Sequence, residues 1–222
     1  MDRAMLCTLV LLSIVQSMWS FVQRDMTGDV FVYQMDNKQT QVALQLMSNE
    51  TLRSFTICLR TFTDRSGPYG LFELITHPPF YSEITIFKSS SRSYTLTVRA
   101  EKIDFLTKDL VNQWVPLCFS WESATGTACF WENGVRLPRH GLNRGHVLKR
   151  SVSSTLGKRR ESPPYIPQYV GELDELYMWD YVLSNSEVLH YTTASSSFSP
   201  GNILNWRNLT YNLIDDVVVE PF

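Results

Sequence analysis

Alternation of apolar and polar side chains, repeated along much of the chain, is the feature that most restricts its fold. Between Ser93 and Arg99, the apolar side chains occupy even positions and the polar ones odd positions. This is the period of a β-strand with one buried face. On similar grounds we expect strands at residues 30–33, 41–46, 55–59, 83–87, 115–121, 127–132 and 173–179.

Turn and helix signals complete an all-β pattern. Asn133-Gly134 separates two strand-like runs, and both residues tolerate the positive φ of a type I′ hairpin turn. One segment is typical of a helix, because Ser184 can cap it and Glu187 can complete a capping box. No linker or fixed repeat divides the chain. We predict an antiparallel jelly-roll β-sandwich, lectin-like, with one short helix on a face, as a single domain at residues 21–222.

The N-terminus resembles a secretory leader. Arg3 precedes a mostly apolar run at residues 4–15, which is too short to span a hydrocarbon core of ~30 Å as a helix. We therefore predict a signal peptide at residues 1–20, cleaved between 17 and 22. The alternative is a buried N-terminal strand. No other run predicts a transmembrane segment, so we expect a secreted, extracellular protein.

Secretion would place the cysteines in an oxidising compartment, where disulfides form. Of four cysteines, Cys7 would leave with the leader, so one pair and one unpaired residue would remain in an oxidising compartment. If Ser123 and Gly126 close a hairpin, Cys129 faces Ser120 while Cys118 faces Trp131, which argues against a Cys118–Cys129 bond. We pair Cys58 with Cys118 and expect Cys129 to be a small buried thiol.

Charge and motifs exclude several functions. Twenty basic against 22 acidic residues give a net charge of −2, without the basic excess typical of nucleic-acid binding. The four histidines are dispersed and belong to no hydrolase, metalloprotease or phosphate-binding motif, so we expect no enzyme activity. Six tryptophans could line a sugar-binding surface, but we expect Trp121, Trp131 and Trp179 to fill the core. Asn49 and Asn208 begin glycosylation sequons.

Several blocks together resemble one family. Cys118-Phe119-Ser120-Trp121-Glu122-Ser123 is similar to the core of the pentraxin signature, in which a cysteine is followed by x-[Ser/Thr]-Trp-x-[Ser/Thr]. The family has histidine where this chain has Pro116, a position that supports packing. Other similar blocks follow in family order, at residues 25–32, 130–134, 170–173, 176–180 and 202–206. The chain is identified as resembling the short pentraxins over nearly all of its mature length.

The resemblance implies a secreted protein with a jelly-roll sandwich and a Cys58–Cys118 disulfide, and on a secreted protein we expect glycosylation at Asn49 and Asn208. It implies a homo-oligomer, usually a flat ring of five subunits, that binds phosphate-bearing, anionic or carbohydrate ligands on one face with calcium. Such proteins act as pattern-recognition proteins of innate immunity and the acute phase, and other immune proteins would be partners. Repeated weak sites on a ring would give avidity for microbial or damaged-cell surfaces.

The calcium positions depart from the family pattern. Tyr81 and Ser82 stand where the family has Asp-Asn, while Arg159, Arg160 and Glu161 stand at a Glu-Gln-Asp run. Pro167 falls at or near a later glutamine. Calcium requires several oxygen ligands, and one carboxylate beside two guanidinium groups opposes two dications. Calcium, although implied by the family, is therefore not expected to bind in the family manner.

The basic stretch at residues 136–160 contains eight basic side chains and no acidic one, which leaves three interpretations. Its charges can be solvated and balanced elsewhere. Lys158, Arg159 and Arg160 can instead bind an anion without metal, because guanidinium pairs with phosphate through parallel hydrogen bonds. The site can also be inactive, in which case the fold serves as a structural or protein-interaction module. A glycan-processing enzyme would require paired carboxylates that the sequence does not indicate.

Overall fold

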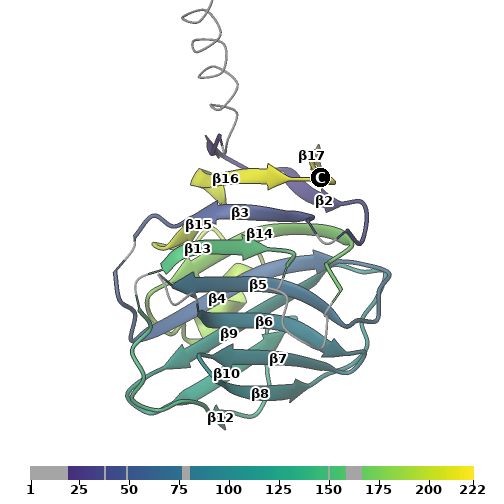
Figure 1. Cartoon of the computed structure of the whole chain (residues 1–222). Helices are drawn as coiled ribbons and strands as arrows, with labels where there is room; N and C mark the ends of the chain where they lie inside the picture. The colour runs from purple at the N-terminus through teal and green to yellow at the C-terminus, as the bar shows by residue number, and fades with distance from the viewer. Residues whose placement is uncertain (1–19, 38, 49, 77–80, 150, 159–166) are drawn as a thin grey trace, which may run out of the picture.

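Two antiparallel sheets face each other in the computed structural model, which describes residues 20–37, 39–48, 50–76, 81–149, 151–158 and 167–222. The strands of sheet A lie at the front of Figure 1. In spatial order they are β1 (Val22–Arg24), β16 (Leu209–Ile214), β3 (Gln41–Gln45), β13 (Ser151–Leu156), β5 (Tyr69–Thr76), β6 (Ser82–Ser90), β7 (Ser93–Val98) and β8 (Glu101–Leu106).

Sheet B lies behind sheet A. Its order is β11 (Val135–Arg136), β10 (Thr127–Glu132), β9 (Val115–Glu122), β4 (Ser54–Phe62), β14 (Gly171–Trp179), β2 (Asp29–Tyr33) and β17 (Val217–Pro221). Two short strands join it at the side, β12 (His140–Gly141) on β10 and β15 (Leu204–Asn205) on β14. The predicted all-β antiparallel sandwich is confirmed.

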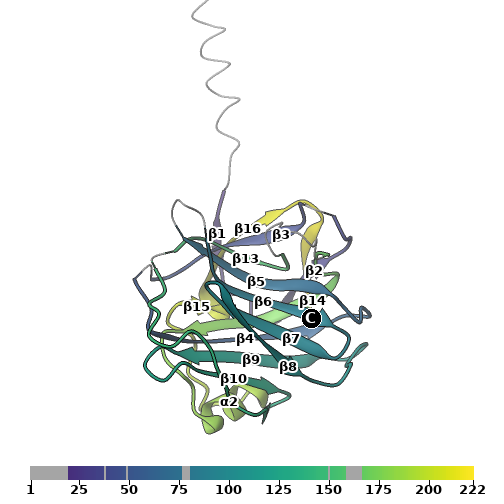
Figure 2. The same cartoon turned by 60° about the horizontal axis from the view of Figure 1, so that its bottom comes forward.

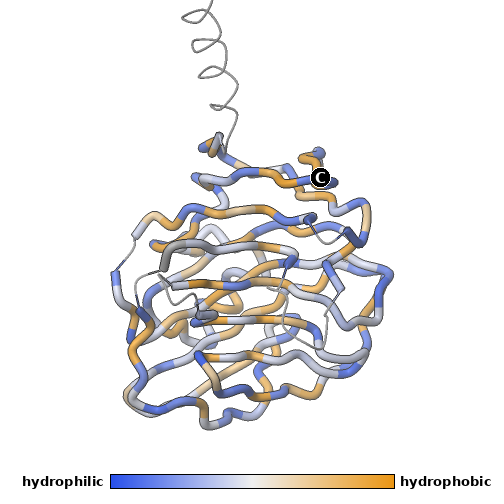
Figure 3. The backbone as a smooth tube through the Cα atoms, viewed as in Figure 1, coloured by the Kyte–Doolittle hydropathy of each residue, from blue (hydrophilic) through white to orange (hydrophobic). Residues whose placement is uncertain are grey.

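The core forms where the inner faces of the two sheets meet, and the predicted alternation produces it. Tyr94, Leu96 and Val98 of β7 are buried against sheet B, and Figure 3 shows apolar and polar positions alternating along the strands. Tyr94 of β7 contacts Phe119 of β9 across the two sheets, with ring centroids 6.2 Å apart. Side chains from both sheets thus form one continuous core.

A single α-helix among the described residues, α2 (Asn185–Thr192), lies on the outer face of sheet B (Figure 2). Its predicted capping box is confirmed: the Ser184 hydroxyl accepts the Glu187 amide at 3.3 Å, and the Glu187 carboxylate accepts the Ser184 amide at 2.7 Å. Its inner side buries Val188 and Tyr191. The centre of sheet B is therefore covered on both faces.

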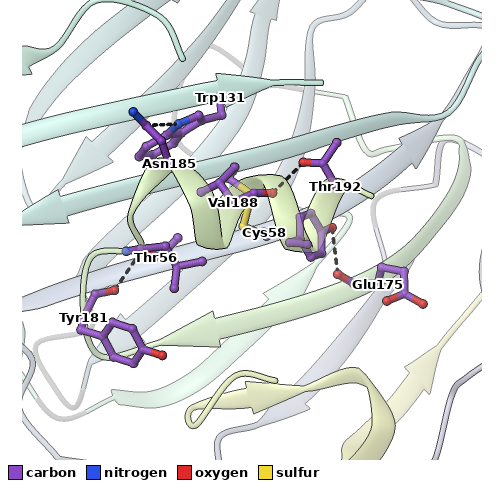
Figure 4. Close-up of a disulfide and its surroundings, with 11 residues drawn as sticks. Thr56, Cys58, Trp131, Glu175, Tyr181, Asn185, Val188 and Thr192 are labelled. Atoms are coloured by element: carbon purple, nitrogen blue, oxygen red, sulfur yellow. Dashed lines mark hydrogen bonds between the residues drawn. A yellow bond between two sulfur atoms is a disulfide. The ribbon is translucent and has the colours of Figure 1, made fainter. Parts of the chain in front are cut away.

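The predicted disulfide lies beneath this helix (Figure 4). Cys58 of β4 and Cys118 of β9 are directly opposed in register, with Cα atoms 4.1 Å apart, and are bonded. The expected hairpin register is also confirmed, because Cys129 faces Ser120 and Trp131 faces Cys118. Cys129 is free and buried, as expected.

Local predictions elsewhere hold at the turn and at the tryptophans. Asn133 and Gly134 adopt φ of 53° and 76° in a two-residue loop between the paired Glu132 and Val135, as a type I′ turn requires. Trp121, Trp131 and Trp179 are all at most 3% exposed. They are buried in the core cluster, as expected.

Some strands had no alternating signal. Six of the eight consecutive residues of β5 are buried in an unbroken run, and its outward-facing Glu73 is only 2% exposed. A strand covered on both faces does not alternate. We also did not predict β8, β16 or β17, although Leu209, Tyr211 and Leu213 of β16 alternate with polar residues. Nothing in the described part of the chain forms a helix long and apolar enough to span a membrane.

Candidate ligand-binding site

A pocket of about 300 Å³ opens on the outer face of sheet A, where β6 begins. We call it the Arg99 pocket; its lining residues are Tyr81, Ser82, Thr85, Thr97, Arg99 and Ala100. Thr85 of β6 and Thr97 of β7 are directly opposed in register. The alternation that turns Ile84 and Leu96 into the core therefore turns these threonines outward.

Arg99 supplies the positive charge of this pocket. It directly follows β7 with a φ of 60°, a left-handed conformation that allows the tight connection to β8. Its guanidinium carbon lies 3.5 Å from the centre of the Tyr81 ring, a cation–π contact. Stacking fixes the plane of the guanidinium while leaving its in-plane N–H groups able to donate to an anion.

A buried acid–histidine pair lies behind Arg99. The Glu83 side chain is 1% exposed, and its two carboxylate oxygens have different partners. One lies 3.9 Å from an Arg99 nitrogen, and the other 2.8 Å from Nε2 of His146. Since Glu83 is shared and Arg99 keeps 27% of its side chain exposed, the guanidinium retains a face toward solvent.

The donor set of this pocket does not fit calcium. Tyr81 presents a phenol stacked under a cation, and the Ser82 hydroxyl already donates to the Glu73 carboxylate. Among the residues that the structure describes, no three acidic, histidine or cysteine side chains gather where they could hold a metal ion. A dication would have to displace these contacts and lie close to Arg99, which Coulomb repulsion opposes.

The predicted positions are not all brought together. Tyr81 and Ser82 lie in the pocket, whereas Lys158 follows β13, whose residue Leu156 pairs with Phe72 near the start of β5. Ser82 pairs with Ile75 near the end of β5, so Lys158 and Tyr81 are at opposite ends of that strand. Pro167 accepts a hydrogen bond from Gly70 at 3.2 Å, at the same end as Lys158.

The remaining predicted residues fall outside the described part of the chain. These are Arg159, Arg160, Glu161, the sequon residue Asn49 and the leader at 1–19. Arg99 was the residue that sequence reasoning missed. The only signal for it was its place on the polar face of an alternating strand, beside Thr97.

Two antiparallel sheets packed face to face define the class of lectin-like jelly-roll β-sandwiches. The model of the pentaxin family matches residues 29–221. Serum amyloid P-component of Bos taurus is 34% identical over 206 residues, covering 91% of each chain. C-reactive protein of Sus scrofa is 32% identical over 227 residues, covering 100% of this chain and 98% of its own. The chain belongs to the pentraxin family.

A solved structure agrees at the level of the fold. The native heptameric SAP-like pentraxin from Limulus polyphemus superposes with a TM-score of 0.71 at 18% identity, covering 89% of this chain and 96% of its own. As a member of the pentraxin family, the chain is not an enzyme.

Proposed function

We propose that this chain is a secreted pattern-recognition protein that binds phosphate-bearing or other anionic ligands through the Arg99 pocket, without calcium. The observation that carries the proposal is the guanidinium of Arg99, whose carbon lies 3.5 Å from the centre of the Tyr81 ring. Tyr81 and Ser82 stand where the family has an Asp-Asn pair. In this proposal the guanidinium of Arg99 supplies the positive charge that a bound calcium ion supplies in the family pattern.

Chemistry in the pocket supports an oxyanion as the ligand. The guanidinium offers parallel N–H donors that match two phosphate oxygens, and the hydroxyls of Thr85 and Thr97 line the same space. A volume of about 300 Å³ suits one headgroup or one sugar unit, and carbohydrates bearing sulfate or carboxylate have the same anionic chemistry. The contribution of Lys158, Arg159 and Arg160 remains a prediction.

Assembly and secretion belong to the same proposal. A ring of identical subunits would convert a weak single site into avidity for a surface, and the SAP-like pentraxin of Limulus is heptameric. Asn208 is exposed at the end of a short 3-10 helix (Trp206–Asn208), a position open to a glycan on a secreted chain. Cleavage of residues 1–20 is proposed on sequence grounds alone.

The test is retention on phosphoethanolamine beads with and without a calcium chelator. We expect the wild-type protein to be retained equally in both conditions. R99Q should reduce retention about tenfold, as loss of a hydrogen-bonded ion pair to phosphate predicts. K102Q is the matched control. Lys102 of β8 is directly opposite Thr97 of β7, but it does not line the pocket.

Retention that depends wholly on calcium would overturn the metal-free proposal. Absence of retention in every condition would favour the alternative, a pentraxin fold that has lost ligand recognition and serves as a structural or protein-interaction module.

A further inference from the structure

A second and larger pocket lies on the other sheet, beside the N-terminus of α2. We call it the α2 pocket; it measures about 460 Å³ and includes Glu122, Cys129, Trp131, Arg139, Leu183 and Asn185 in its lining. Trp131 donates its indole N–H to Asn185 at 3.0 Å (Figure 4). This bond ties β10 to the helix and fixes one wall of the pocket.

The one unpaired thiol among the described residues, that of Cys129, lines this pocket. Cys129 and Trp131 are two residues apart on β10, so both point to the outer face of sheet B. Ser120 is directly opposite Cys129 in register and points the same way. Its hydroxyl is fully buried and has no hydrogen-bond partner among the described residues. Cys129, which lines the pocket, therefore lies beside a buried hydroxyl that has no hydrogen-bond partner.

Two opposite charges line the pocket without neutralising each other. The Glu122 carboxylate accepts the Thr125 hydroxyl at 2.9 Å. Neither Glu122 nor Arg139 takes part in an ion pair within the described chain. A ligand with both an ammonium and a carboxylate group would be able to pair with both.

We infer that Cys129 is a modification site, which forms a mixed disulfide with a small zwitterionic aminothiol delivered as its disulfide, with cystine as the probe. The Cys129 thiolate attacks one cystine sulfur, a new S–S bond forms, and the cystine S–S bond breaks. The protein thiol is oxidised and cystine is reduced. The departing cysteine thiolate takes up the proton that Cys129 lost, so each modified site releases one cysteine.

The geometry also predicts selectivity. Cys129 is only 5% exposed, so a small disulfide that enters the pocket reacts while a bulky one is excluded. The Cys58–Cys118 bond does not take part, because it lies beneath α2 (Figure 4). The inference does not depend on the proposed ligand function, since the two pockets lie on different sheets.

The test compares cystine with the uncharged hydroxyethyl disulfide on the purified, folded protein, with adducts counted by intact mass. We expect a single adduct per chain from cystine, formed on the order of tenfold faster than from the uncharged disulfide, as two surface ion pairs predict. The E122Q/R139Q double variant should lose this preference but keep its rate with hydroxyethyl disulfide. C129S should form no adduct, and R99Q should react like the wild type.

Modification of Cys129 only in denaturant would overturn the proposal. Equal rates with both disulfides, or an unchanged preference in E122Q/R139Q, would overturn the assignment of a zwitterionic ligand.

Discussion

Single buried charges in this protein depend on specific partners. Arg60 of β4 donates to Asp174 of β14 at 2.8 Å from its Nε, and its guanidinium lies 5.1 Å from the ring of Trp114 and 5.4 Å from that of Phe222. The Asp174 side chain is only 3% exposed. This pair lies on the outer face of sheet B, near the disulfide.

Burial makes Asp174 a pH-sensitive residue. Desolvation raises the pKa of Asp174 from 3.8 to about 6, although the hydrogen bonds from Arg60 oppose the rise. The folded chain therefore holds a proton that the unfolded chain releases in this range. The stability that Asp174 contributes is largest below pH 3.8 and declines as the pH rises to about 6.

The D174N variant tests this sign. We expect D174N to be less stable than the wild type in urea denaturation, because its amide offers one acceptor oxygen where the carboxyl group accepts two hydrogen bonds from Arg60. The wild type should exceed D174N in free energy of unfolding by more at pH 4 than at pH 6.5. These two conditions lie near the ends of the titration of Asp174. A gap that stays constant or widens with pH would contradict the assignment.

At the scale of elements, the capping box of α2 is the clearest local device. The capping box stabilises the N-terminus of the helix that covers the disulfide. Because S184A removes the capping hydroxyl, it should lower the free energy of unfolding by about 1 kcal/mol. S196A is the control, since Ser196 is exposed and lies beyond the helix. Equal urea midpoints for S184A and the wild type would show that the cap contributes nothing.

The elements that could be predicted from sequence were those with a local signal. β7 alternates, Asn133-Gly134 allows positive φ, and Ser184 with Glu187 caps a helix, so each is recognisable from its own residues. β5 is not, because both of its faces are buried. Cys58 was paired correctly with Cys118, but only the structure showed that α2 covers this disulfide.

At the scale of the whole molecule, the two pockets lie on different sheets and depend on contacts between distant segments. Arg99 contacts Tyr81, which lies 18 positions earlier in the sequence. Arg139 and Glu122 both line the α2 pocket. Family resemblance located Tyr81 and Ser82. It could not indicate Arg99, because no family position pointed to it, and the cation–π contact exists only in the folded chain.

The proposed independence of calcium is what most sharply separates this chain from the family pattern. Isothermal titration of the purified full chain with calcium, at neutral pH, addresses it directly. With a tyrosine under a guanidinium where relatives place acidic and amide ligands, we predict no saturable heat of binding up to millimolar calcium. Two saturable sites of micromolar to millimolar affinity would contradict this prediction.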